Sequence, residues 1–169
     1  MLNSLIGANN TMEVVTLIDN EIEISPEAQR KNIGLFEDFL TTVPGAKFGD
    51  AACPLKHTFA DGVYIREITM EKGLICTSKI HKKEHPYFVL QGDVTVVTET
   101  ETVRIKAPHW GITTPGTKRV LYVHETTVWA TVHRTNETDL AKIEDEIIAK
   151  DYAELSEPTT KKLNTEDTL

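Results

Sequence analysis

The sequence predicts a mainly β protein, built as a small barrel with one helix before it and one amphipathic helix after it. Three observations lead to this fold class. Between Gly73 and Arg134 the chain passes through short β-type segments separated by turn residues, a proline-initiated helical pattern precedes them, and an apolar stripe at helical spacing follows them. Short strands at regular spacing are typical of β-sandwiches and barrels.

The length and composition favour one folded domain with appended helices. The chain has 169 residues, of which 40% are hydrophobic and 26% charged, as in ordinary globular proteins. Its net charge of −8 argues against a nucleic-acid partner, because binding the phosphate backbone needs clustered Lys and Arg. No apolar run approaches the roughly 20 residues that cross a bilayer, and the N-terminus lacks the pattern of an export signal. We therefore expect no membrane contact and a location in the cytoplasm.

The N-terminal part predicts an arm and a helix. Residues 1–24 fix no clear period and are expected to form an extended arm or an edge strand. Ser25 followed by Pro26 predicts a helix start, with a hydroxyl to cap exposed amides and a proline in the first turn. Apolar residues within 33–40 are spaced for one helical face, and the helix is expected to end near Thr41.

Residues 44–62, rich in Gly, Pro, Ala and Asp, predict a loop that crosses to the barrel. Alternating or apolar runs then predict strands over residues 63–68, 74–80, 87–92, 93–98, 102–107, 111–114, 119–124 and 127–133. Apolar residues at three- and four-residue steps predict an amphipathic helix over 139–155, capped by Thr138 or Asp139.

These elements divide the chain into four expected parts. They are an arm, helix and loop over residues 1–56, a β-barrel over 57–135, a C-terminal helix over 136–155 and a flexible tail over 156–169.

At the centre of the barrel segment, residues 79–92 combine a polar half with an apolar half closed by Gly92. A later glycine, Gly111, is followed by the turn Pro115-Gly116. This pattern resembles the two sequence motifs of the cupin family, whose members form double-sheet barrels also called RmlC-like jelly rolls. The resemblance implies a cupin-like double-sheet jelly-roll barrel.

The resemblance also shows where the chain departs from the family pattern. The positions of the two motif histidines hold Lys79 and His81, the glutamate position holds His85, and the histidine position of the second motif holds Arg119. Metal sites of this kind want neutral imidazoles, carboxylates or thiolates, and a protonated Lys or Arg opposes a cation. The usual metal centre of the family is therefore not favoured, and no cofactor is assigned.

Three interpretations of this pocket stay open. In the first, Lys79, His81, His85 and Arg119 face the barrel mouth and bind a carboxylate, a phosphate or an acidic sugar. In the second, which is less favoured, His81 and His85 hold a divalent metal with help from a further histidine, His124 or His133. In the third, the polar groups hydrogen-bond one another and Glu84 or Glu67 at the barrel rim, and no ligand binds.

The amino-acid sequence of residues 80–96 and 120–133, followed by the acidic stretch 143–152, resembles that of small cupin-like proteins encoded by tailed bacteriophages. This resemblance implies a non-enzymatic binding or structural component of a virion or its assembly, located in the host cytoplasm or in the virion. Its expected partners are further copies of the chain, through helices, strand edges or the arm, or other virion proteins. The alternative is a cupin enzyme, either a metal-dependent isomerase or oxygenase or a sugar-nucleotide epimerase-like catalyst. No catalytic residue is assigned.

Overall fold

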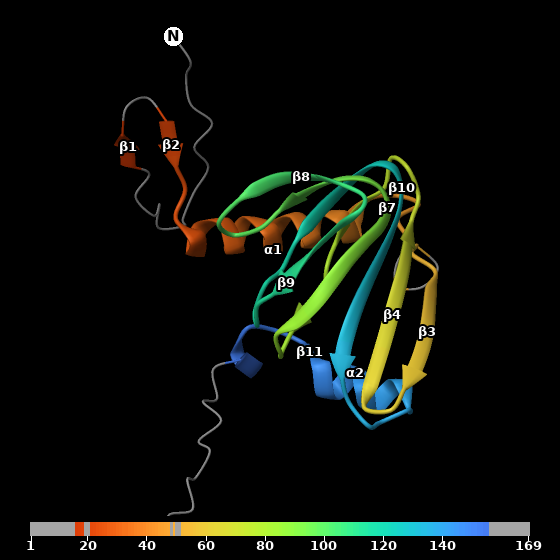
Figure 1. Ribbon diagram of the computed structural model, residues 1–169. Coiled ribbons are helices and arrows are strands. Elements are labelled where there is room, and N and C mark those ends of the chain that lie inside the picture. Colours follow the sequence, from red (N-terminus) through yellow and green to blue (C-terminus); the bar gives the residue numbers. More distant parts are fainter. Residues whose placement is uncertain (1–15, 19–20, 48, 50–51, 156–169) are drawn as a thin grey trace, which may run out of the picture.

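The computed structural model describes residues 16–18, 21–47, 49 and 52–155 (Figure 1). Two helices flank a set of antiparallel strands: α1 spans Pro26–Thr42, α2 spans Leu140–Ile147, and a 3-10 turn covers Ala153–Leu155. The strands are β1 (Thr16–Ile18), β2 (Glu21–Glu23), β3 (Leu55–Ala60), β4 (Val63–Met70), β5 (Ile75–Thr77), β6 (Ile80–His81), β7 (His85–Val97), β8 (Thr102–Lys106), β9 (His109–Thr113), β10 (Val120–Arg134) and β11 (Ile148–Ala149). The predicted fold class, a mainly β jelly-roll barrel with two helices, is confirmed.

The two long strands, β7 and β10, each belong to both layers of the barrel. The first half of β7 pairs with β9 and with the second half of β10. This half of β10 also pairs with β4, and β4 pairs with β3. The second half of β7 pairs with β8 and with the first half of β10, which also pairs with β5. The chain thus bends once in each long strand to pass between the layers.

The bend in β7 lies at Gly92, which has φ +97°. In β10 the pairing with β7 shifts register between Val123 and Trp129. Bulges of this kind increase the local bend of a strand and are common at the corners of barrels. The sequence predicted separate strands on either side of residues 92–93 and of residues 125–126. This is wrong, because β7 and β10 each continue as one strand through the bend.

The apolar core lies between the two layers. Val89 and Trp129 come from one layer, and Val94, Val123 and Leu121 come from the other. All five side chains are buried, as the alternating pattern of their strands requires. A smaller apolar cluster joins Tyr64 of β4 to Ile143, Ile147 and Ile148. This cluster attaches α2 to the end of the barrel where β4 begins and β10 ends (Figure 1).

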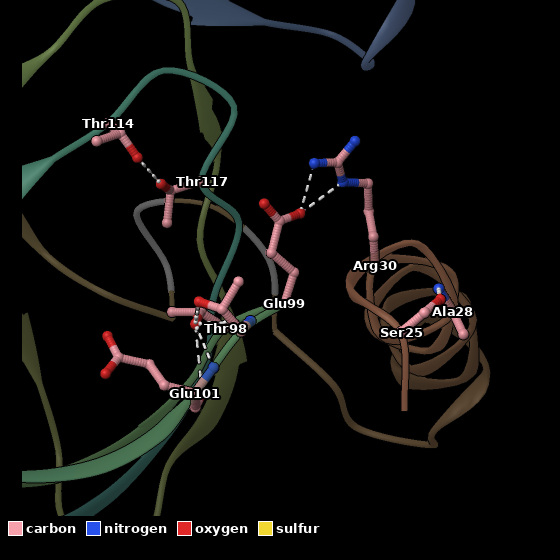
Figure 2. A network of polar contacts seen from close by, with 9 residues as sticks. Ser25, Ala28, Arg30, Thr98, Glu99, Glu101, Thr114 and Thr117 are labelled. Carbon is pink, nitrogen blue, oxygen red and sulfur yellow. Dashed lines mark hydrogen bonds and ion pairs between the residues drawn. The ribbon is translucent and has the colours of Figure 1, made fainter. Parts of the chain in front are cut away.

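The first helix begins and ends close to the predicted residues. Ser25 caps it, and its side-chain oxygen accepts a hydrogen bond of 3.2 Å from the backbone N–H of Ala28 (Figure 2). Arg30 holds the helix against the turn after β7, with its guanidinium 2.6 Å from the carboxylate of Glu99 (Figure 2). Ile33 is the buried residue of the predicted apolar face.

Two further expectations, on residues 55–60 and on the end of the C-terminal helix, are wrong. Residues 55–60, predicted as part of a loop, form β3, which pairs with β4 along its whole length. The signal for this hairpin was the turn Asp61-Gly62, where Gly62 has the positive φ of +70° that two-residue hairpin turns need. The C-terminal helix ends at Ile147 instead of Leu155 because Ile148–Ala149 forms β11 and pairs with β6.

At the N-terminus β1 pairs with β2, in line with a strand in the predicted arm. The other residues of the arm, 1–15 and 19–20, and the predicted tail, residues 156–169, lie outside the described residues. Among the helices that the structure describes, none is long and apolar enough to span a membrane.

Candidate functional site

Three buried histidines meet inside one end of the barrel. His81 comes from β6, His85 begins β7, and His133 lies near the end of β10. The ring centre of His85 lies 4.2 Å from that of His81 and 4.4 Å from that of His133, and the ring centres of His81 and His133 are 5.2 Å apart. One nitrogen of each ring can be chosen so that all three lie within 4.8 Å of one another. We call these three residues the histidine cluster.

The antiparallel register explains why His85 and His133 meet. Tyr87 of β7 is the partner of Thr131 of β10. His85 lies two residues before Tyr87, and His133 lies two residues after Thr131. Because residues two apart in a strand share a face, the two histidines lie side by side. His81 joins them from β6, which is anchored by its pairing with Ile148 and by a 3.0 Å hydrogen bond from the Gly116 N–H to the His81 carbonyl.

Hydrogen bonds orient two of the three rings. His85 Nδ1 lies 3.0 Å from the carbonyl of Lys83, so it carries the proton and leaves Nε2 as the acceptor nitrogen. His133 Nε2 lies 3.0 Å from the hydroxyl of Thr131. His81 Nδ1 is buried and has no hydrogen-bond partner among the described residues. A buried polar atom left in this state is costly, and it marks a place where a ligand or ion can supply the missing interaction.

Burial keeps the cluster uncharged. It lowers the pKa of His81 to about 2, and electrostatic repulsion from the protonated forms of His85 and His133 lowers it further. It lowers the pKa of His133 to about 3, with contributions from His85 and Arg66. The pKa of His85 is also lowered, mainly by burial. All three imidazoles are therefore neutral at pH 7, which is the form that binds metal ions.

Arg119 lies beside the cluster in a nearly closed environment. Its exposed fraction is 9%, and one terminal nitrogen donates a 2.9 Å hydrogen bond to the hydroxyl of Thr113. Its guanidinium carbon lies 5.6 Å from the ring centre of Tyr87 and 5.9 Å from that of Trp129. Thr113 lies on β9 and is the cross-strand partner of His85. The hydrogen bond to Thr113 therefore places the guanidinium of Arg119 next to the cluster.

Lys79 does not face this pocket, contrary to the first interpretation of the sequence. Its side chain is 46% exposed and forms an ion pair with Glu144 of α2. Lys79 could share a face with His81 and His85 only in one extended strand from residue 79 to residue 85, where residues two and four apart point to the same side. The chain instead forms β6 only at Ile80–His81 and bends at residues 82–83, so the alternation does not carry across.

His124, the other histidine considered as a helper, lies away from the cluster. It belongs to the half of β10 that pairs with the second half of β7, and its Nε2 lies 2.8 Å from the hydroxyl of Thr95. The structure therefore brings His133, and not His124, to His81 and His85. The alternation of residues 127–133 could have indicated this, because His133 lies four residues after Trp129 and so points to the same, buried side of the strand.

The arrangement offers two kinds of chemistry. Three neutral imidazoles suit zinc, copper, iron or nickel. A buried guanidinium suits a carboxylate or another oxyanion.

Several solved structures resemble this chain. A conserved protein of unknown function from Streptococcus pyogenes has a TM-score of 0.41 at 16% identity, over 57% of this chain and 93% of its own. A cupin superfamily protein from Desulfitobacterium hafniense has a TM-score of 0.43 at 9% identity, over 53% of this chain and 84% of its own. A cupin 2 domain-containing protein from Halorhodospira halophila has a TM-score of 0.43 at 13% identity, over 60% and 83%.

Each of these TM-scores lies below 0.5, so the similarities identify no ligand, activity or partner for this chain. No family model and no curated protein sequence matches the chain.

Proposed function

We propose that this protein is a cupin-type barrel that binds a divalent transition metal through His81, His85 and His133. The observation that carries the proposal is the convergence of three buried ring nitrogens within 4.8 Å, together with the unpartnered Nδ1 of His81. Three protein ligands leave at least one coordination position open, as in catalytic zinc sites.

The surroundings of the cluster fit this role. A ligating histidine normally uses its other nitrogen to hold a backbone carbonyl, carboxylate or water, which fixes the ring and its tautomer. His85 has such a bond to the carbonyl of Lys83. The sequence placed two cations among the ligands. Lys79 is at the surface with Glu144 and does not repel a bound metal at short range, whereas Arg119 stays beside the cluster and donates to Thr113.

Metal binding is tested on the purified chain after treatment with EDTA. We expect the wild-type protein to take up about one equivalent of Co²⁺ or Zn²⁺, measured by elemental analysis and by the visible absorption of bound Co²⁺. The variant H133Q, once circular dichroism has verified that it folds, is expected to bind at least about tenfold more weakly, because it loses one of three ligands.

The matched control is H124Q, which removes a histidine from the same strand but outside the cluster. It should bind metal as the wild type does. A wild-type protein that takes up neither metal, or an H133Q variant that binds as tightly as H124Q, would rule out this site.

The proposal concerns binding, and we assign no catalytic residue. The alternative, a cupin isomerase, oxygenase or epimerase-like enzyme, would use the same cluster and its open coordination position. Turnover of a substrate that is abolished by H133Q and kept by H124Q would distinguish this alternative from binding alone.

A second candidate function is a phage-type structural or assembly component that forms homo-oligomers, as the sequence suggested. An exposed apolar surface supports it: Phe88, Leu90, Trp110 and Ile112 are 38%, 53%, 69% and 50% exposed. Phe88 and Trp110 are cross-strand partners in β7 and β9, and among the described strands β9 pairs only with β7. We call these four residues the outer patch. Open strand edges and large apolar patches are typical of association surfaces.

For this candidate we expect the wild-type chain to sediment or scatter light as an oligomer and the variant W110E to be monomeric, because the charge lies at the centre of the outer patch. The control V103E places the same charge at an exposed apolar residue of β8, outside the patch. A monomeric wild type at high concentration, and absence of the chain from purified phage particles, would argue against an assembly role.

A further inference from the structure

A buried positive charge without an acidic partner lies next to the histidine cluster. Arg119 is nine-tenths buried, and no carboxylate forms an ion pair with it in the described part of the chain. Buried charges in proteins are normally paired, because desolvation strongly penalises an unpaired one. Burial accordingly lowers the pKa of Arg119, although a guanidinium stays charged at neutral pH.

The fold holds Arg119 in place from several sides. Its backbone N–H donates a 2.9 Å hydrogen bond to the hydroxyl of Ser78, and its carbonyl accepts one of 2.9 Å from the Ser78 N–H. Its side chain lies by Tyr87 and Trp129, whose rings stack on each other with centres 4.5 Å apart. The guanidinium is therefore preorganised, and binding a ligand would cost little side-chain entropy.

Most of the donor capacity of this group is unused. A guanidinium has five N–H donors, and Arg119 uses one of them, in the bond to Thr113. The ring contacts with Tyr87 and Trp129 satisfy the charge in part, since the electron-rich face of an aromatic ring attracts a cation. They leave donors for which the described residues supply no acceptor.

We propose that Arg119 binds the carboxylate of a small ligand inside the barrel, next to the histidine cluster. A carboxylate matches the planar fork of a guanidinium with two parallel hydrogen bonds. A phosphate dianion fits less well, because the neighbouring imidazoles are neutral and add no positive charge. The inference rests on the proposed function in one respect: with metal bound, the same ligand lies beside the open coordination position.

The first experiment uses the metal-free chain and sodium acetate as the probe, at constant ionic strength against sodium chloride. Acetate is expected to raise the melting temperature of the wild type in a saturable way, because it binds only the folded state. The variant R119M should show no such rise. R134M, which removes an exposed arginine at the end of β10, should respond like the wild type.

A second measurement separates a ligand-binding arginine from a structural one. Without acetate, R119M should lose little stability, because removing an unpaired buried charge offsets the loss of the hydrogen bond to Thr113 and of the ring contacts. R119K keeps the charge and lacks the fork, and its affinity for acetate should fall about tenfold or more. Equal acetate responses in the wild type, R119M and R119K would overturn the inference, as would a marked loss of stability in R119M.

The Co²⁺-loaded protein distinguishes the two proposals. Acetate should change the visible absorption of bound Co²⁺ in the wild type, and about tenfold or more acetate should be needed in R119M. If Co²⁺ does not bind but acetate still stabilises only the wild type, the metal site is wrong and the role of Arg119 stands. If Co²⁺ binds and acetate acts alike on both proteins, the metal site stands and the role of Arg119 is wrong.

Discussion

Acidification from pH 7 to pH 5 is expected to lower the free energy of unfolding of the metal-free protein by about 4 kcal/mol through His81 and His133 alone. Their pKa values in the folded state are about 2 and about 3, whereas an unfolded histidine titrates near its ordinary value of 6.5. Below pH 6.5 the unfolded chain therefore takes up protons that the folded chain cannot. Stability is present above pH 6.5 and is lost as the pH falls toward the folded-state values. His85, whose pKa is also lowered by burial, adds to the loss.

The measurement is urea denaturation in EDTA at pH 7, 6 and 5. This pH range is chosen because protonation of the acidic groups with lowered pKa values, among them Glu137, Glu146 and Glu154, lowers the free energy of unfolding mainly below about pH 4.5. The double variant H81Q/H133Q should lose most of the slope between pH 7 and pH 5, whereas H124Q should keep it. Parallel stability curves for the wild type and the double variant would show that these two imidazoles are not buried in the folded protein.

The parts of the fold that were predictable are those fixed by local patterns. The Ser25-Pro26 start of α1, the alternation within β7 and β10 and the closing Gly92 all depend on neighbours in the sequence. The length of α2 depends on a distant partner, because Ile148 leaves the helix to pair with His81. Such pairing between remote segments overrides helical propensity and has no local sequence signal.

The candidate site was predictable to the same extent. The resemblance to the cupin motifs, aligned on Gly92 and on the Pro115-Gly116 turn, implies His81, His85 and Arg119 as pocket residues. Lys79 was placed wrongly because a bend at residues 82–83 interrupts the alternation that the sequence suggested. His133 could be named only as one of two candidate helpers, since its position opposite His85 follows from the register of β7 and β10, which bulges shift at the corner of the barrel.

The substitution of Gly92 by alanine is expected to destabilise the protein by about 3 kcal/mol or more. Two effects add at this position. Gly92 has φ +97°, a conformation that costs an L side chain roughly 1–2 kcal/mol. A Cβ atom would also lie 2.6 Å from the carbonyl oxygen of Thr126 and in contact with the hydroxyl of Thr127, on the adjacent strand β10. Because these are backbone and buried atoms at the bend, they cannot move without disturbing the pairing of β7 with β10.

The matched control is G73A. Gly73 has a similar positive φ of +83°, but no atom lies within 4 Å of the place that its Cβ would take, so only the backbone effect applies. Thermal and urea unfolding of the two variants therefore separates the steric effect from the conformational one, and G92A should lose clearly more stability than G73A. Equal losses would mean that β10 does not approach the backbone of Gly92 as closely as the bend requires. A larger loss in G92A would show that β10 leaves no room for a side chain at the corner where the sheet that carries the histidine cluster joins the second layer.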